Sequence, residues 1–249
     1  MNLNKMALAI IALCGLGSAQ AEGCREQLPQ VMQMAYGDEA VASDAVVCKV
    51  WPAQPQFTLV AVPLPRASYD GHGETDLEIL VVATASGRIQ ARRLEPDLLD
   101  WDAVSVDGLV LDTALYRLSD QQLAFGLRID RRSSSSANPF YETSLRLYLL
   151  KGDQLQVPLE QLLVSSSSGE WDTRCTGEWH DRTVTLAVAE QSGRGGYRDL
   201  LLSERSVQSR AEMRGEDCMT VEERVTKQRY RLTYDGQRYN VPAELQVLQ

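Results

Sequence analysis

The stretch LRLYLLKGDQLQVPL, residues 145–159, contains the pattern that decides the fold. Leu145, Leu147 and Leu149 alternate with other residues and would therefore share one face of an extended strand. A turn-forming Lys-Gly-Asp follows at 151–153, and apolar residues then resume. A run, a glycine-containing turn and a second run are typical of a β-hairpin, so the stretch predicts antiparallel sheet.

Similar segments recur along most of the chain. The sequence YRLTYDGQRYNV, residues 230–241, places Asp235 and Gly236 between two alternating runs, which is a strong hairpin signal. Helical candidates are few and fall at 25–36 and 95–101. These patterns predict an all-β protein of antiparallel meanders and hairpins, arranged as a β-sandwich or a small propeller-like array, with a short N-terminal helical extension. Further short apolar or alternating runs lie at 57–62, 76–84, 88–94, 123–130 and 184–188.

The serine runs at 133–136 and 165–168 predict loops rather than linkers between separate cores. We therefore expect a single all-β domain over 51–249, preceded by an N-terminal extension over 22–50.

The N-terminus has the pattern of a secretory signal peptide. Lys5 precedes an apolar run that is too short to span a bilayer as a helix, and small residues occupy positions 19 and 21. We expect residues 1–21 to be cleaved and the mature protein to be periplasmic, or secreted, without a transmembrane segment.

The chain is acidic, with 34 Asp and Glu against 25 Lys and Arg and a net charge of −9. A negative long-range field repels phosphate, so the composition argues against nucleic acid as a partner.

The mature chain would keep four cysteines, Cys24, Cys48, Cys175 and Cys218. In an oxidising compartment an even number favours two disulfides. Three pairings are possible, and proximity in the sequence favours Cys24–Cys48 and Cys175–Cys218. The alternative is a zinc site, which would lack any close Cys-x-x-Cys pair and would have only two histidines available.

Several catalytic patterns are missing from the sequence. There is no Gly-x-Ser-x-Gly, neither His72 nor His180 adjoins a nucleophile signature, and paired cysteines leave no reactive thiol. The glycine-rich SGRGGY at 192–197 does not follow the pattern of a phosphate-binding loop. We therefore predict no catalytic residues and no cofactor, although paired carboxylates for hydrolysis follow no spacing rule and stay open.

The segment DGHGETD, residues 70–76, is the candidate metal site. Asp70, His72, Glu74 and Asp76 stand at every second position, and oxygen ligands in a glycine-rich loop suit calcium, or a transition metal with the histidine. The alternative interpretation is an exposed polar turn.

The segment GEWDTRCTGEWH, residues 169–180, separates into two faces if it is one extended strand. Both tryptophans and Cys175 would point to a core. The opposite face is polar and is either a plain solvated face or a surface for a protein partner. Its candidate binding residues are Glu170, Asp172, Glu178 and His180.

Two resemblances accompany these patterns. GGYRDLLLSE, residues 195–204, resembles a strand entry of FG-GAP-type propeller blades, without the calcium loop of those blades. A second resemblance is to a group of exported proteins of Gram-negative bacteria. It is carried by CKVWPAQPQFTLVAV (48–62), DLEILVVATASGRI (76–89) and VSSSSGEWDTRCTGEW (164–179). This resemblance implies no activity and no site residues.

These observations together favour an exported, disulfide-containing β protein that acts through a protein-binding surface on a protein of the cell envelope. Inhibitors, immunity proteins and envelope accessory factors belong to this class. The alternative is an envelope hydrolase or a metal-dependent enzyme that uses the 70–76 loop. The sequence leaves the oligomeric state open.

Overall fold

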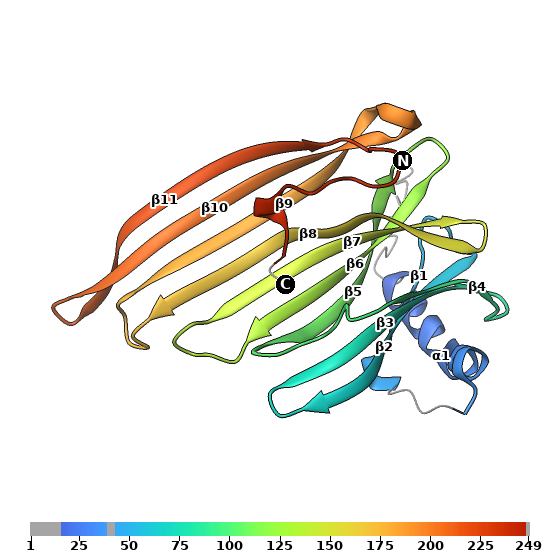
Figure 1. The fold of residues 1–249 in the computed structure, drawn as a ribbon, viewed down its shortest axis with the longest axis horizontal. Helices are drawn as coiled ribbons and strands as arrows, with labels where there is room; N and C mark the ends of the chain where they lie inside the picture. The colour runs from blue at the N-terminus through green and yellow to red at the C-terminus, as the bar shows by residue number, and fades with distance from the viewer. Residues whose placement is uncertain (1–15, 39–42, 248–249) are drawn as a thin grey trace, which may run out of the picture.

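Two antiparallel sheets and one N-terminal helix make up the computed structural model, which describes residues 16–38 and 43–247 (Figure 1). The small sheet has the order β1-β2-β3-β4 and the large sheet the order β11-β10-β9-β8-β7-β6-β5, so neighbouring strands follow one another in the chain. The predicted all-β fold with an N-terminal helix is confirmed, and of the two arrangements left open by the sequence the structure has the sandwich-like one rather than the propeller-like array. The elements are α1 (Leu16–Tyr36), β1 (Val47–Val50), β2 (Phe57–Tyr69), β3 (His72–Ala83), β4 (Ile89–Glu95), β5 (Val104–Arg117), β6 (Leu123–Ser133), β7 (Phe140–Lys151), β8 (Gln154–Trp171), β9 (Gly177–Ser192), β10 (Arg198–Arg214), β11 (Asp217–Leu232) and the 3₁₀ turns η1 (Ser43–Ala45), η2 (Arg194–Gly196) and η3 (Ala243–Leu245).

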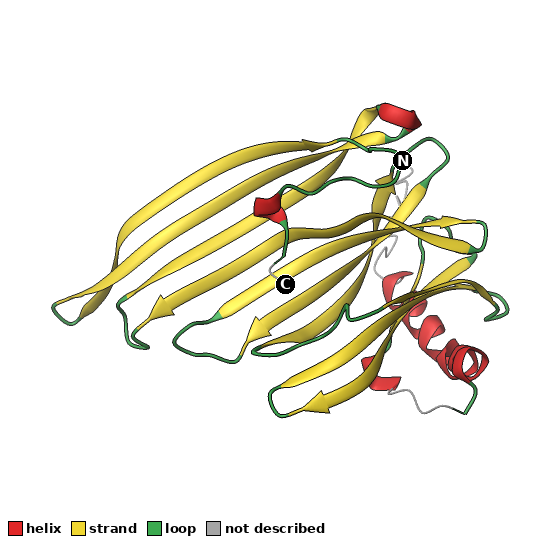
Figure 2. Ribbon diagram, in the orientation of Figure 1, coloured by secondary structure: helices red, strands yellow, loops and turns green. Residues whose placement is uncertain are grey.

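Helix α1 covers the outer face of the small sheet (Figure 2). Val31 of α1 is fully buried against Val60 of β2 and Leu80 of β3. The helix predicted for residues 25–36 is therefore confirmed. Its apolar residues recur at helical spacing and form one side, which packs on the small sheet. The other predicted apolar positions, Leu28, Met32 and Ala35, are partly buried in the same cluster.

The inner face of the small sheet packs against the large sheet. Phe125, Leu127 and Ile129 of β6 alternate along the strand, and all three are buried in one cluster with Leu59 of β2 and Ile79 of β3. The period-two pattern of residues 123–130 thus marks the face of β6 that meets the second layer.

A second core lies within the large sheet and the C-terminal segment. Leu145, Leu147 and Leu149 of β7 cluster with Tyr239 and Leu245, which follow β11. The predicted turn at 151–153 joins β7 to β8. The predicted hairpin at 230–241 is shorter than expected, since β11 ends at Leu232 and only one bridge flanks the turn, between Tyr234 and Tyr239.

Both predicted disulfides are present. Cys24 of α1 pairs with Cys48 of β1 across a Cα–Cα distance of 6.1 Å, and Cys175 pairs with Cys218 across 5.6 Å. Both distances lie in the usual range for disulfides. The zinc alternative for these cysteines is therefore wrong.

The serine run at 165–168 is not a loop, contrary to the prediction. These residues belong to β8 and pair with β7 on one side and with β9 on the other. Pairing on both sides satisfies the backbone groups, which overrides the weak strand preference of serine. The other run, at 133–136, begins at the end of β6 and continues into a loop.

The predicted signal peptide lies largely outside the described residues, which begin at 16. Residues 16–21 belong to α1, and the predicted extension over 22–50 supplies the rest of α1 together with β1. No helix within residues 16–38 and 43–247 is long and apolar enough to cross a membrane.

Candidate functional site

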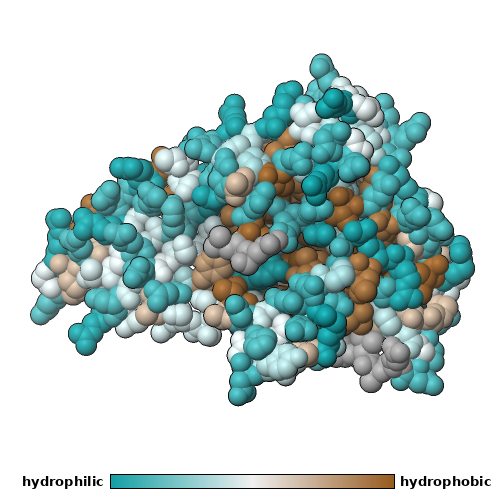
Figure 3. All heavy atoms as spheres, viewed as in Figure 1, coloured by the Kyte–Doolittle hydropathy of each residue, from teal (hydrophilic) through white to brown (hydrophobic). Residues whose placement is uncertain are grey.

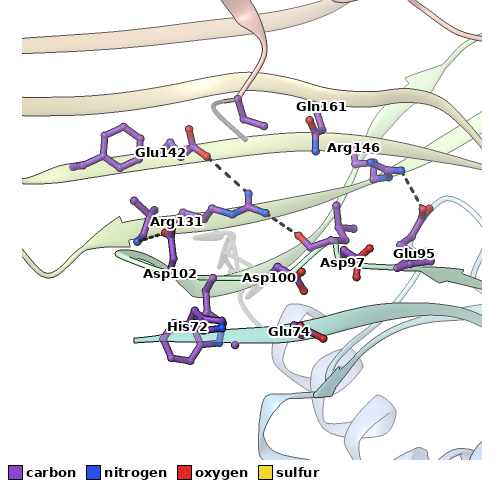
Figure 4. A pocket seen from close by; sticks show the side chains of 17 residues that line it. His72, Glu74, Glu95, Asp97, Asp100, Asp102, Arg131, Glu142, Arg146 and Gln161 are labelled. Carbon is purple, nitrogen blue, oxygen red and sulfur yellow. Dashed lines mark hydrogen bonds and ion pairs between the residues drawn. The ribbon is translucent and has the colours of Figure 1, made fainter. Parts of the chain in front are cut away.

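A cleft of about 1030 Å³ opens between the two sheets (Figure 4). One wall comes from β6, β7 and β8 of the large sheet. The other comes from the start of β3 and from the connection between β4 and β5, residues 96–103. Its lining residues are His72, Gly73, Glu74, Glu95, Pro96, Asp97, Leu98, Asp100, Trp101, Asp102, Val104, Arg131, Phe140, Glu142, Arg146, Gln161 and Val247.

Arg131 and Glu142 form a buried charged pair on the large-sheet wall. They face each other across β6 and β7, with Arg131 Nη1 3.9 Å from Glu142 Oε1. Arg131 also donates a 2.8 Å hydrogen bond to the carbonyl oxygen of Leu98. Burial raises the pKa of the Glu142 carboxyl and lowers the pKa of Arg131, and the attraction between them compensates only in part.

A second charged group at the cleft is fully paired. Glu95 of β4 accepts from Arg93 at 2.6 Å and from Arg146 of β7 at 3.1 Å. Arg146 also donates to the carbonyl oxygen of Glu160. Since both Glu95 oxygens already have a charged donor, this group links the two sheets and offers little to a ligand.

The predicted metal loop forms the hairpin between β2 and β3. Asp70 lies in the turn, and the His72 ring stacks on Tyr69 with centroids 4.8 Å apart. Asp76 pairs with Arg66 at 2.9 Å, and Glu74 lies 3.8 Å from the same guanidinium. Within residues 16–38 and 43–247, no three His, Cys, Asp or Glu side chains are placed to hold a metal ion together. The structure brings only His72 and Glu74 of the four candidates to the cleft.

The connection over 96–103 is one part of the cleft that the sequence does not predict. The sequence predicts a helix over 95–101, but Glu95 ends β4, residues 96–99 form a turn and Trp101 makes a bridge to Gly73 of β3. The backbone groups of Trp101 and Gly73 exchange hydrogen bonds of 2.9 and 3.0 Å, and the Trp101 ring occupies the space where a side chain at position 73 would lie. This long-range anchor explains why the local helical spacing fails.

The second candidate site is a groove of about 430 Å³ on the distal end of the large sheet, which we define as residues 165–171, 177–183, 205–214 and 217–227. The prediction of one continuous strand over 169–180 is wrong, because residues 172–176 form a turn between β8 and β9. The groove is lined by Asn138, Ser168, Gly169, Glu170, Glu178, Trp179, His180, Gln208, Ser209, Arg210 and Glu222.

The structure brings three of the four predicted surface residues to this groove, namely Glu170, Glu178 and His180, all of them exposed. Asp172 lies in the turn instead, where its carboxylate accepts from the backbone nitrogens of Arg174 and Cys175 at 2.9 and 2.8 Å. Hydrogen bonds from the Cys175 and Arg174 amides lower the pKa of Asp172.

Glu170 and Glu178 are directly opposite each other in the β8–β9 ladder. Arg210 faces Glu178 from β10, but it pairs with Glu212 and, at 3.7 Å, with Glu222. Within the described part of the chain, neither Glu170 nor Glu178 forms an ion pair. The groove therefore carries two adjacent carboxylates without a counter-ion.

Comparison with known proteins adds no family to this description, since no family model, curated protein or solved structure matches the chain.

Proposed function

We propose that this protein is an exported binding protein, and that a partner protein of the cell envelope presents Lys or Arg side chains to the groove. The single observation that carries the proposal is the unneutralised pair Glu170–Glu178. Two like charges directly opposite each other in a sheet reduce the stability of the fold, and Glu170 and Glu178 are such a pair. A Lys or Arg side chain of the partner would neutralise this repulsion on binding.

The structure of the distal end supports this proposal. It extends past the small sheet and α1 (Figure 1), and its surface in Figure 3 is mainly hydrophilic, whereas hydrophobic residues gather nearer the middle of the view. Between residues 207 and 231 Ala211 alone is buried. This part of the chain contributes little to a core and much to an accessible surface.

The Cys175–Cys218 disulfide holds this surface in shape. It joins the β8–β9 turn to the first residues of β11, next to the β10–β11 turn. A rigid surface loses less conformational entropy when it binds. Two disulfides also fit a protein of an oxidising compartment, as expected after export.

Affinity capture tests the proposal. Mature wild-type protein, the double variant Glu170→Gln/Glu178→Gln and the control Asp153→Asn/Glu190→Gln would be immobilised and exposed to an envelope extract of the producing cells. The control removes the same charge from two exposed positions that lie outside the groove.

We expect one protein to be captured by the wild type and by the control, and to be lost with the Glu170→Gln/Glu178→Gln variant. Circular dichroism melting would establish that all three proteins are folded. Capture of the same proteins by all three baits would refute the assignment of the groove.

A further inference from the structure

Strand β11 forms one edge of the large sheet (Figure 1). It pairs with β10 on one side, and within residues 16–38 and 43–247 no strand pairs with its other side. An open edge presents unpaired backbone N–H and C=O groups, to which a strand of another chain can add. β11 has 16 residues and contains neither proline nor glycine, so it is longer than most strands and little interrupted. Of residues 217–231, Val221 and Tyr230 are half-buried and the others are exposed.

The charges of β11 are separated along the strand, because the first half is acidic and the second half is basic. A second copy placed antiparallel along the same edge would bring its acidic half beside the basic half of the first, and its basic half beside the acidic half. The edge is therefore complementary to itself, as a two-fold symmetric interface requires. The acidic residues are Asp217, Glu222 and Glu223, and the basic residues are Arg224, Lys227, Arg229 and Arg231.

The central charges of β11 are not neutralised within one copy. Lys227 lies directly opposite Arg205 of β10, and like charges in this position reduce the stability of a sheet. Glu223 projects from the same face four residues earlier, where it lies opposite Ser209. In the described part of the chain, none of Arg205, Glu223 and Lys227 forms an ion pair. A carboxylate beside Lys227 would remove the repulsion, and the chain itself supplies none there.

We infer that two copies of this protein pair antiparallel along β11 and join their large sheets into one continuous sheet. The two-fold axis is perpendicular to the sheet, so one residue of β11 lies opposite its own counterpart. An axis at Glu223, Arg224 or Lys227 would place like charges against each other. An axis at Val225, whose side chain is 42% exposed, instead brings two apolar side chains together.

This register supplies the missing carboxylate. With Val225 on the axis, Glu223 of each copy lies directly opposite Lys227 of the other copy, so the pair occurs twice. Each Glu223 thus neutralises the repulsion between Arg205 and Lys227 across the interface. The dimer goes beyond the proposed function and does not depend on it, because the acidic pair of the groove lies on β8 and β9, inside the edge.

Sedimentation velocity of the protein that begins at residue 22, measured over a range of concentrations, tests the inference. The wild type should form dimers, and added salt should weaken them by screening. Lys227→Glu and Glu223→Lys should each weaken association at least about tenfold, since each reversal acts twice across the axis. The double variant Glu223→Lys/Lys227→Glu should dimerise again, because it restores both opposite-charge pairs.

Two controls separate association from folding and from overall charge. Lys227→Glu places a carboxylate opposite Arg205, so its monomer should melt no lower than the wild-type monomer when both are dilute. Arg117→Glu makes the same change of charge at an exposed position of β5, the other edge strand of the large sheet, and should dimerise like the wild type.

A wild type that stays monomeric up to submillimolar concentration would overturn the inference and would show that the charges only protect the edge from pairing. Failure of the double variant to dimerise would overturn the register centred on Val225. Equal weakening by Arg117→Glu and Lys227→Glu would show that β11 is not the interface.

Discussion

Asp112 illustrates how one carboxylate holds an irregular part of a strand. The pairing of β5 with β6 shifts register between Asp112 and Tyr116. Across this interruption Asp112 accepts hydrogen bonds from the Ala114 nitrogen at 3.0 Å, the Tyr116 hydroxyl at 2.8 Å and Arg128 Nε at 2.8 Å. Burial alone would raise the pKa of Asp112, but these three donors outweigh it and hold the pKa below the usual value of 3.8.

The lowered pKa of Asp112 predicts how the stability of the variant Asp112→Asn, relative to the wild type, depends on pH. A carboxyl with a lowered pKa adds stability that is complete above pH 3.8 and is lost as the pH falls through its value in the folded protein. At neutral pH the variant should lose about 2 kcal/mol of unfolding free energy, because it loses bonds to a charged acceptor. The difference in melting temperature between wild type and variant should shrink in acid. A difference that stays constant from neutral pH to below 3.8 would contradict this account.

At the scale of elements, the sequence predicted the strands well because alternation is a local property. The runs at 57–62, 123–130 and 184–188 all lie in strands, and the turn at 151–153 joins β7 to β8. The wrong predictions, a helix at 95–101 and a loop at 165–168, are explained by contacts with residues that are distant in the sequence. The helical spacing at 95–101 is overridden by the pairing of Trp101 with Gly73, and the serines at 165–168 are held by neighbours on both sides.

The candidate sites depend on register between strands, which residue patterns do not specify. The sequence drew attention to Glu170, Glu178 and His180, but it placed them on one strand, whereas the groove arises because a turn brings Glu170 opposite Glu178. The pairing of Arg131 with Glu142 depends on which residues of β6 and β7 face each other. No motif marks either residue, so only the assembled sheet reveals the charged wall of the cleft.

The cross-strand pair Glu170–Glu178 leads to a prediction about stability. The double variant Glu170→Gln/Glu178→Gln should be more stable than the wild type by about 0.5 kcal/mol, because it removes a like-charge pair. Urea denaturation at low ionic strength would measure the gain, and added salt should reduce it by screening. A loss of stability in the double variant would show that these carboxylates stabilise the fold. The argument that they are kept for binding a cationic partner would then be contradicted.

At the scale of the molecule, the two disulfides act at opposite ends of the chain. Cys24–Cys48 ties α1 to the small sheet, while Cys175–Cys218 closes a loop of sequence separation 43 at the distal end of the large sheet. A loop of this length corresponds to about 4 kcal/mol of stabilisation in the chain-entropy model. Since few residues of the distal end are buried, we expect the disulfide to provide much of its order.

The cysteines therefore support a prediction for the protein that begins at residue 22, the mature form expected from the sequence. Thiol titration of the denatured, unreduced protein should find close to no free thiol. The variant Cys175→Ser/Cys218→Ser should melt at a lower temperature and should be cleaved by protease first within 205–227, while His180→Ala should melt like the wild type. Four reactive thiols, or unchanged melting and proteolysis in the cysteine variant, would contradict this role of the disulfide.

The most direct test of the proposed function is hydrogen–deuterium exchange of the mature protein, alone and bound to the partner isolated by capture. Binding at the groove should slow amide exchange at 168–180 and 208–222, where β8, β9, β10 and β11 carry the acidic pair and its neighbours. Exchange at the cleft, in residues 96–103, should not change. Slower exchange elsewhere, with no change at 168–180 and 208–222, would show that the partner binds another surface.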